Sequence, residues 1–406
     1  MSARQLAVIA VTAMLCGSTP YQDFGFGNVM EINSPAAAGS TVPNLSAGPG
    51  NRVYMSWIDL RPDSTHALRF SVLNGRQWSL PRTISVSKKG GWFVNWADFP
   101  SVLAVDDNRL VAHWLVRSGA GHYAYNVHVA RSRDRGRTWT HSGVLHRDSS
   151  QAEHGFVSLA RAGNTVAAVW LDGRKHATAQ SEGEGEMTLQ FATLDSLGIP
   201  AGETELDPRV CDCCQTAMAV TSAGPIVAYR DRSPSEVRDI AVVRLVNGRW
   251  TTPRLIHGDN WTIPACPVNG PAIAASGRNV VAAWFTGADN RSRINVAFSS
   301  NAGKTFRRPI RIDDGEPAGR VDVQLMDDGT ALISWLERVG PTAEVRVKRV
   351  TTKGHVSKAR TITVSSGERA SGFPQMIYRG SDVVFAWTMP GRPARVRTAI
   401  LGLTRS

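Results

Sequence analysis

The sequence lacks a hydrophobic run long enough to span a bilayer. The apolar run near its start, Leu6–Leu15, is too short for a membrane helix, and a single positive charge at Arg4 precedes it. This pattern is typical of a signal peptide, which we place at residues 1–18, and it predicts export to the periplasm or the medium. Cys16 follows the run and raises the alternative of a lipoprotein held at a membrane, although Leu15 is bulkier than lipoprotein processing usually accepts.

A cluster of basic residues is also absent. The net charge of +12 would attract polyanions, but the Lys and Arg residues are scattered along the chain and form no basic run. The sequence therefore predicts a generally basic surface and no specific nucleic-acid partner.

Cysteine is scarce, with 5 residues in a chain of 406, which excludes a small fold held together by many disulfides. Core material is plentiful, since hydrophobic residues make up 42% of the chain and charged residues 20%. The 37 Gly and 21 Pro are spread throughout, which favours many short strands joined by turns over long helices.

One pattern recurs seven times: a short apolar strand, a turn rich in Gly, Asn or Asp, and a more apolar strand that ends in an aromatic residue. The aromatic ends are 51 to 59 residues apart and fall at positions 57, 114, 170, 229, 284, 335 and 387. An alternating third strand and a short fourth strand follow each of the earlier copies. Four short strands repeated about every 50 residues are typical of a β-propeller, and the recurrent aromatics are expected to pack between blades.

The last copy runs out of chain before its fourth strand. The segment Gly27–Asn33 has the pattern of the fourth strands elsewhere, and its pairing with the final copy would close the ring. We therefore predict an all-β, seven-bladed β-propeller over residues 19–406 as a single domain and a monomer, with a six-bladed ring plus an irregular unit as the alternative.

Two of the predicted turns, Ser132–Trp139 and Ser299–Phe306, have a more specific sequence. They resemble the Asp-box, or BNR, repeat of the sialidase superfamily: the first matches Ser-x-Asp-x-Gly-x-Thr-Trp in full, and the second has Asn301 for Asp and Phe306 for Trp. The short polar side chain bonds back to the backbone and Gly allows a positive φ, so the motif has a structural role. The resemblance implies a propeller whose functional face lies opposite these turns, on the second-to-third-strand loops and the links between blades.

The resemblance to sialidases also implies a catalytic set of three arginines that hold a carboxylate, a Tyr nucleophile assisted by Glu, and an Asp acid. That set cannot be assigned to residues of this chain. The Arg-Ile-Pro-type sequence that precedes the first Asp box in many sialidases is absent, and the repeat count is seven instead of six.

Several second strands are followed by an acid and an arginine just after the aromatic residue. Such charges at the mouth of a central funnel could grip an anionic ligand, or they could form salt bridges between blades, and both remain open. The candidates for ligand contact are Asp172, Arg174, Arg230, Asp231 and Arg238.

Two links and one loop combine aromatic residues with carboxylates, which suits sugar stacking and acid catalysis. We expect Asp98 or Glu153 to be the proton donor if the protein is an enzyme. The aromatic and imidazole candidates for ligand contact are Trp92, Trp96, His122 and Tyr123. Trp92 and Trp96 could instead only fold the long link over its blade.

Three cysteines, Cys211, Cys213 and Cys214, lie in the link into the fourth repeat, and Cys266 lies in the link into the fifth. Neighbouring links on one face bring the four thiols close together. A disulfide from Cys266 to one of the three is the first expectation, because an oxidising compartment favours bridges. A copper or zinc site with His154 or Asp212 as an optional further ligand is the second.

These features favour an exported, sialidase-like propeller that recognises, and if it is an enzyme hydrolyses, an acidic or neutral glycan in its loop-face funnel. Turnover would then be that of an exo-sialidase-like glycoside hydrolase. Two alternatives remain: a periplasmic copper- or zinc-handling or redox-assembly protein centred on the four cysteines, and a protein-interaction scaffold.

Overall fold

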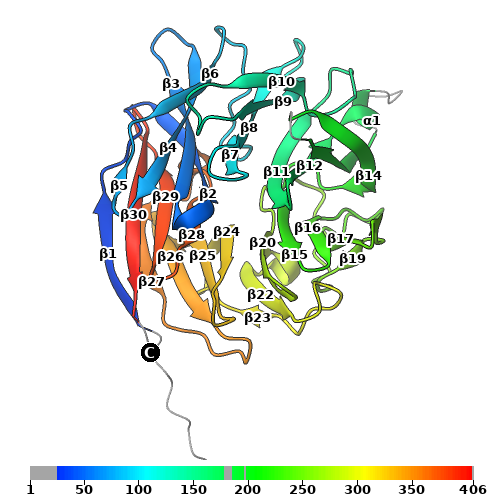
Figure 1. Cartoon of the computed structure of the whole chain (residues 1–406). Coiled ribbons are helices and arrows are strands. Elements are labelled where there is room, and N and C mark those ends of the chain that lie inside the picture. Colours follow the sequence, from blue (N-terminus) through cyan, green and yellow to red (C-terminus); the bar gives the residue numbers. More distant parts are fainter. Residues whose placement is uncertain (1–24, 178–184, 196–197, 405–406) are drawn as a thin grey trace, which may run out of the picture.

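A computed structural model describes residues 25–177, 185–195 and 198–404, and within these residues seven antiparallel sheets stand in a ring (Figure 1). The chain is a seven-bladed β-propeller, as the repeat predicts. The predicted signal peptide and Cys16 lie outside the described residues.

Each blade is built from strands that are consecutive in the chain. Blade 1 contains β2 (Ser40–Ala47), β3 (Val53–Leu60), β4 (His66–Asn74), β5 (Gln77–Trp78) and β6 (Arg82–Val86). Blade 2 contains β7 (Ser101–Ala104), β8 (Leu110–Arg117), β9 (Tyr125–Ser132) and β10 (Thr140–Val144). Blade 3 contains β11 (His154–Ala162), β12 (Thr165–Asp172), β13 (Met187–Leu194) and β14 (Pro200–Val210).

The remaining blades follow the same order. Blade 4 contains β15 (Ala217–Thr221), β16 (Gly224–Arg230), β17 (Ile240–Val246), β18 (Arg249–Trp250) and β19 (Arg254–Leu255). Blade 5 contains β20 (Ala272–Ser276), β21 (Asn279–Thr286), β22 (Arg293–Ser299) and β23 (Ile310–Arg311). Blade 6 contains β24 (Pro317–Leu325), β25 (Ala331–Val339), β26 (Thr342–Val350) and β27 (Arg360–Ser365), and blade 7 contains β28 (Gln375–Tyr378), β29 (Asp382–Met389) and β30 (Arg395–Leu403).

The ring is closed by the N-terminal strand. β1 (Phe26–Ile32) pairs antiparallel with β30, with Val29 opposite Leu401 and Ile32 opposite Thr398. The first and last strands of the described chain therefore lie side by side in blade 7 (Figure 1). This confirms the predicted closure of the last blade, one residue away from the predicted bounds.

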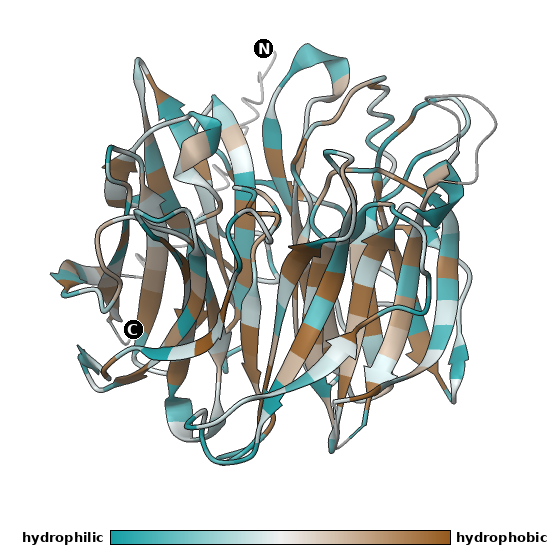
Figure 2. Ribbon diagram, turned by 90° about the horizontal axis from the view of Figure 1, so that it is seen from above, coloured by the Kyte–Doolittle hydropathy of each residue, from teal (hydrophilic) through white to brown (hydrophobic). Residues whose placement is uncertain are grey.

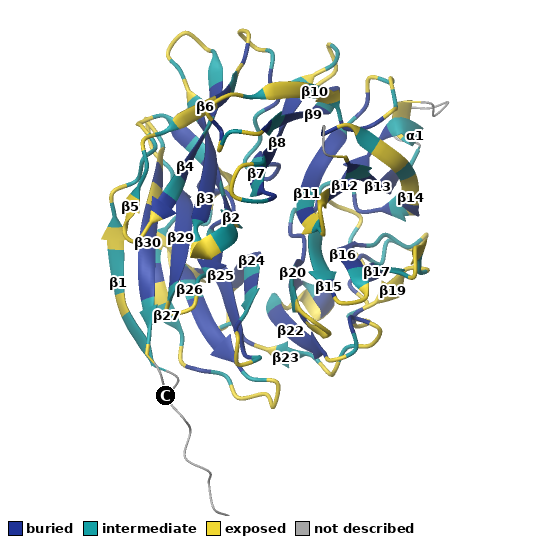
Figure 3. Ribbon diagram, viewed as in Figure 1, coloured by how far each residue is buried: buried dark blue, intermediate teal, exposed yellow. Residues whose placement is uncertain are grey.

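The inner strands are apolar on both faces because the blades stack face to face. In β8, every residue from Leu110 to Leu115 is buried, whereas the outer strand β10 is exposed or half-buried throughout (Figure 3). Brown stretches of apolar residues recur within the strands around the ring (Figure 2). A strand covered on both faces is expected to be continuously apolar, which explains why these second strands are the most hydrophobic of each repeat.

The recurrent aromatic residues are packing residues. All seven are at most 2% exposed: Trp57, Trp114, Trp170, Tyr229, Trp284, Trp335 and Trp387. Apolar clusters join each blade to the next, and the last cluster packs Trp57 of blade 1 with Val384 of blade 7. This packing distributes the core around the ring.

The two turns that resemble Asp boxes have the same hydrogen-bond network. In the first, Ser132 Oγ accepts from Gly136 N at 2.7 Å, and Asp134 Oδ1 accepts from Thr138 N at 2.9 Å. In the second, Ser299 and Asn301 accept from Gly303 N at 3.0 Å and from Thr305 N at 2.9 Å. Gly136 and Gly303 both have φ of +75°, which explains the glycine at that position.

The described helices are single turns: α1 (Arg174–Ala177), η1 (Pro49–Asn51), η2 (Ala288–Asn290) and η3 (Arg369–Ser371). None of the helices among the described residues has the length and apolar character needed to cross a bilayer.

Candidate functional site

The loops on one face of the propeller surround a pocket of about 710 Å³, which we call the loop-face pocket. Its wall comes from links between blades and from the second-to-third-strand loops of blades 2 and 3. The aromatic and charged residues in this wall are Trp96, Tyr123, Glu153, Phe156, His176, Asp212 and Arg369. Cys213 and Cys266 also line it.

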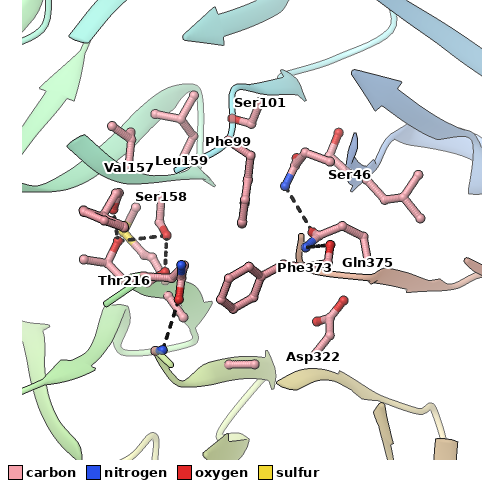
Figure 4. Close-up of a pocket in the computed structure, with 18 of the residues that line it drawn as sticks. Ser46, Phe99, Ser101, Val157, Ser158, Leu159, Thr216, Asp322, Phe373 and Gln375 are labelled. Carbon is pink, nitrogen blue, oxygen red and sulfur yellow. Dashed lines mark hydrogen bonds between the residues drawn. The ribbon is translucent and has the colours of Figure 1, made fainter. Parts of the chain in front are cut away.

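A second hollow of about 230 Å³ runs along the ring axis between the innermost strands. Ser46, Ser158, Thr216, Asp322 and Gln375 point toward this axial channel (Figure 4). Phe99 and Phe373 lie across it with their ring centroids 6.1 Å apart. Ala97 and Phe156 line both hollows, so the channel adjoins the floor of the loop-face pocket.

Glu153 belongs to a group of three acidic side chains, of which Tyr125 and Asp98 are buried and Glu153 is half-buried. The hydroxyl of Tyr125 donates to Glu153 Oε1 at 2.7 Å and lies 3.4 Å from Asp98 Oδ2. Asp98 also accepts from the backbone N–H of Phe156 at 2.9 Å. Because one phenol proton serves two carboxyl groups, at least one of the carboxyls is favoured in its protonated form.

Burial disfavours the ionisation of both carboxyls. Desolvation is the main reason that the pKa of Glu153 is raised to about 8, against the hydrogen bond from Tyr125. The nearby charges of Asp98 and Asp212 contribute to this rise. Desolvation likewise raises the pKa of Asp98 to about 7. Glu153 is therefore protonated at neutral pH and lines the pocket, which are the two properties a general acid needs.

The structure places the two predicted proton donors differently. Glu153 faces the loop-face pocket, whereas Asp98 is buried beneath it and lines the axial channel. A second ionisable pair stands in the pocket wall, since His176 Nε2 lies 3.5 Å from Asp212 Oδ1.

The three arginines proposed as ligand contacts do not line the loop-face pocket. Arg174 is bound to Asp172 at 2.6 Å and to Glu203 at 2.7 Å. Arg238 is bound to Glu236 at 2.7 Å. These ion pairs each lie within a single blade, whereas the alternative expected salt bridges between blades.

Arg230 has a different set of partners. Its guanidinium is buried and donates to the backbone carbonyls of Asn269, Arg238 and Phe285 at 2.6 to 3.0 Å. It also lies over the ring of Trp261, 4.9 Å from the centroid. Arg230 therefore joins blade 4 to the link and second strand of blade 5.

The two acids proposed as ligand contacts, Asp172 and Asp231, have partners within the protein. Asp172 is buried and accepts from the indole N–H of Trp170 at 2.9 Å. Asp231 is half-buried, accepts from the backbone N–H of Arg232 at 2.8 Å, and has a pKa raised to about 6 by burial. Neither acid lines the loop-face pocket.

Of the four other candidates for ligand contact, two line the pocket. Trp96 stacks on Phe373 with centroids 5.8 Å apart, and Tyr123 is 56% exposed. Trp92 is buried and folds the link onto blade 2, where its ring lies 6.0 Å from that of Trp114. His122 is exposed and packs edge-on against Tyr123.

The four described cysteines come together as expected, but none forms a disulfide. Cys211 Sγ lies 3.4 Å from Cys214 Sγ and 4.0 Å from Cys213 Sγ, far beyond the bonded distance of about 2.05 Å. Cys266, from the next link, lines the loop-face pocket together with Cys213. The structure therefore differs from the expectation of a Cys266 disulfide.

His154 does not join the cysteines. Its Nδ1 donates toward the carbonyl oxygens of Tyr125 and Ala152 at 3.1 Å, and its Nε2 faces Asp148 at 3.0 Å and Asp172 at 3.7 Å. This arrangement fixes the link into blade 3 beside the pocket and removes His154 from the proposed ligand set of the thiols.

Two residues of the site were not predicted from the sequence. Tyr125 begins the third strand of blade 2, and Arg369 lies in the link into blade 7. The resemblance to sialidases implies a Tyr nucleophile assisted by a Glu, and Tyr125 is hydrogen-bonded to Glu153. Tyr125, however, is 0% exposed, and its ring stacks on Phe93 with the centroids 4.1 Å apart. The phenol therefore acts on Glu153 from below the pocket surface.

No protein-family model matches this chain, and no curated protein matches it. Among solved structures, a polysaccharide lyase of the PL25 ulvan lyase family is similar at 10% identity and a TM-score of 0.57, covering 91% of this chain and 96% of that chain. The polysaccharide lyase Uly1 is similar at 9% identity and a TM-score of 0.54, covering 95% of this chain and 93% of that chain. At this identity the likeness shows a shared propeller fold.

A Hadza microbial sialidase is similar at 15% identity and a TM-score of 0.46, covering 73% of this chain. This chain spans 63% of the length of that sialidase.

Proposed function

We propose that the loop-face pocket binds a saccharide and that Glu153 donates a proton to the glycosidic oxygen during its cleavage. The observation that carries this proposal is a half-buried carboxyl whose pKa is raised to about 8, in the wall of a pocket of about 710 Å³. Pockets of this size suit a short stretch of sugar residues.

The surroundings of Glu153 support the role of an acid. Its proton is retained at neutral pH because burial and the charges of Asp98 and Asp212 disfavour the carboxylate. Once it has given up the proton, the Tyr125 hydroxyl stabilises the resulting anion through the 2.7 Å hydrogen bond. A proton donor in such a position contributes about 10²- to 10⁴-fold to the rate.

The exposed ring of Tyr123 offers an apolar surface for the C–H face of a sugar. Trp96 is fixed by Phe373 on its ring and by Arg320, whose guanidinium carbon lies 5.1 Å from the ring centroid. The pocket wall contains one arginine, Arg369. The proposal therefore does not include three arginines that hold a carboxylate. It includes both acidic and neutral saccharides as ligands.

Two of the similar structures are named as polysaccharide lyases, and the propeller fold shared with them supports the choice of a saccharide as the ligand class. We also propose that the protein acts outside the cytoplasm, because of the signal-peptide pattern at residues 1–18. Fractionation of the producing cells tests this: recovery in the cytoplasm with an intact N-terminus would contradict it.

The test incubates the protein with a uronic-acid polysaccharide, a sialylated oligosaccharide and a neutral arabinan. Cleavage is detected by the appearance of new reducing ends and by the ultraviolet absorbance of unsaturated uronic acid. We expect cleavage of at least one. Glu153→Gln should then lower the rate by about 100-fold or more while the substrate still binds.

The matched control is Glu344→Gln, because Glu344 lies in β26 and is paired with Arg346 far from the pocket wall. This variant should retain the wild-type rate. Absence of binding and of cleavage across the whole panel would overturn the proposal, and so would a Glu153→Gln variant as active as the wild type.

A further inference from the structure

The cluster of cysteines beside the pocket is unused by the proposed acid chemistry. Cys211, Cys213 and Cys214 lie in the link from blade 3 to blade 4, and their three Sγ atoms are all within 4.8 Å of one another. Cys211 is 1% exposed and Cys214 is 2% exposed, whereas Cys213 and Cys266 line the loop-face pocket. The cluster is thus a buried pair of thiols reached through two thiols at the pocket wall.

The separations of the sulfur atoms fit a shared ion. Three sulfurs at about 2.3 Å from one metal ion are about 3.8 Å apart in a tetrahedral arrangement and about 4.0 Å apart in a trigonal one. The distances from Cys211 Sγ are 3.4 Å to Cys214 and 4.0 Å to Cys213. The first distance is a few tenths of an ångström below the expected separations and the second equals the trigonal one, while all three sulfurs lie within 4.8 Å of one another.

Buried positive charge surrounds the same sulfurs. Arg238 Nη1 donates to Cys211 Sγ at 3.3 Å, and the Arg238 side chain is 4% exposed. Arg230 is buried nearby, and its described hydrogen bonds go to neutral carbonyl groups, so its charge acts on the thiols. Several thiolates can be buried together only where such charge compensates them.

We propose that Cys211, Cys213 and Cys214 bind one Cu(I) ion, and that Cys266 receives the ion from the pocket and passes it to Cys213. Binding is a ligand exchange: the copper arrives as Cu(I), each bound thiol releases its proton to water, and no electron is transferred. Soft thiolate ligands select Cu(I).

Copper is favoured over zinc by the number of ligands. Structural Zn²⁺ takes four ligands in almost all cases, and the described set within range contains three sulfurs without Cys266. Asp212, the nearest carboxylate in the chain, lies against Arg232, Arg238 and His176 at 3.5 to 3.7 Å. A charged network of this kind keeps Asp212 from serving as the fourth ligand.

The test uses the full chain, reduced and handled without oxygen, titrated with Cu(I) in the presence of a chromogenic Cu(I) chelator and, in parallel, with Zn²⁺. We expect one copper ion per chain to be retained against the chelator, and X-ray absorption to show sulfur ligands only, about three at about 2.3 Å. Thiol counting on protein taken directly from cells accompanies the titration.

Variants separate the roles of the thiols. Cys213→Ser should weaken Cu(I) binding by more than about 100-fold, since even residues behind the ligands change metal affinity by about 10- to 100-fold. Cys266→Ser should leave the affinity within a few-fold of wild type and slow the loading. If Cys213→Ser does not fold, the X-ray absorption of the wild type decides the question without a variant.

Failure to retain copper with all four thiols reduced would overturn the proposal. It would also be overturned by disulfides among these cysteines in protein taken from cells, or by stoichiometric zinc in place of copper. The result is independent of the proposed function, because Glu153→Gln should bind copper normally and Cys213→Ser does not remove the proton donor.

Discussion

The hydroxyl of Tyr125 donates a hydrogen bond of 2.7 Å to the carboxyl of Glu153, and the phenol itself is completely buried. The pair combines a proton donor at the pocket surface with a support that solvent does not reach. The pKa of Glu153 is raised to about 8 in spite of this bond, because burial outweighs it. The two residues together therefore set the pH range in which the proposed acid holds its proton.

The first prediction concerns the pH dependence of cleavage. Glu153 must be protonated to act as an acid, so the rate should fall as the pH rises through about 8. The measurement is the rate of saccharide cleavage from about pH 6 to about pH 10, a range that brackets the pKa of Glu153. A rate that is already lost near pH 5, where an ordinary Glu ionises, would contradict the assignment.

The same shift predicts a dependence of stability on pH. The folded pKa lies above the value of 4.5 for an ordinary Glu, so between these values the folded state binds more protons than the unfolded state. The contribution of Glu153 to the free energy of unfolding should therefore decline as the pH rises from about 4.5 to about 8. Urea unfolding of the wild type and of Glu153→Gln over this range checks it, since the variant lacks this part of the decline.

Tyr125→Phe should raise the pKa of Glu153 further. The change removes the hydrogen bond that stabilises the carboxylate and leaves the ring stacked on Phe93. We expect the alkaline loss of cleavage to move upward by about 1 pH unit, which corresponds to about 1.4 kcal/mol. A downward shift, or none, would show that the phenol does not act on this carboxyl.

The sequence predicted the ring because each repeat carries its own local signal. The aromatic end of the second strand marks every blade, and the pattern at Gly27–Asn33 revealed the missing strand of blade 7. The sequence could also have predicted the hydrogen-bond partner of one aromatic residue. Trp170 and Asp172 are two residues apart in one strand, so their side chains lie on the same face. That rule would have assigned Asp172 to the indole.

The site itself depended on contacts between segments far apart in the chain. Arg230 was proposed as a ligand contact from its place after Tyr229, but its partners are carbonyls at Asn269 and Phe285, which no local pattern indicates. Tyr125 was missed for the same reason, since it meets Asp98 and Glu153 only when the links of blades 2 and 3 fold over it. Links set these contacts, and links vary from blade to blade.

Arg238→Met should weaken Cu(I) binding without removing a ligand. The variant keeps most of the side-chain volume but removes the donor 3.3 Å from Cys211 Sγ and the positive charge beside it. We expect a loss of affinity of about 10- to 100-fold at unchanged stoichiometry, measured by competition with the Cu(I) chelator. Arg249→Met, an exposed residue of β18, is the matched control and should bind as the wild type does.

Arg230→Met should destabilise the fold. The guanidinium satisfies three buried backbone carbonyls of Asn269, Arg238 and Phe285, and methionine leaves all three without this donor. Each unsatisfied buried group costs about 1 to 3 kcal/mol, so the free energy of unfolding should fall by about 3 kcal/mol or more. Urea unfolding measures it, and Arg249→Met again serves as the control. A loss below about 1 kcal/mol would contradict this role.

Removal of the N-terminal strand should open the ring. A chain that begins at residue 34 lacks β1, which leaves the outer edge of β30 unpaired. It also loses four half-buried apolar side chains, worth about 1 kcal/mol each: Phe26, Val29, Met30 and Ile32.

We expect the truncated chain to unfold with a free energy lower by about 4 kcal/mol or more and to aggregate through the open edge. Urea unfolding and size-exclusion chromatography measure the two effects against a chain that begins at Gly25 and keeps β1. The strand is paired through its backbone from Val29 to Ile32, so substitution of single side chains in β1 should cost much less than its removal. Equal stability of the two chains would mean that blade 7 holds the ring closed with three strands.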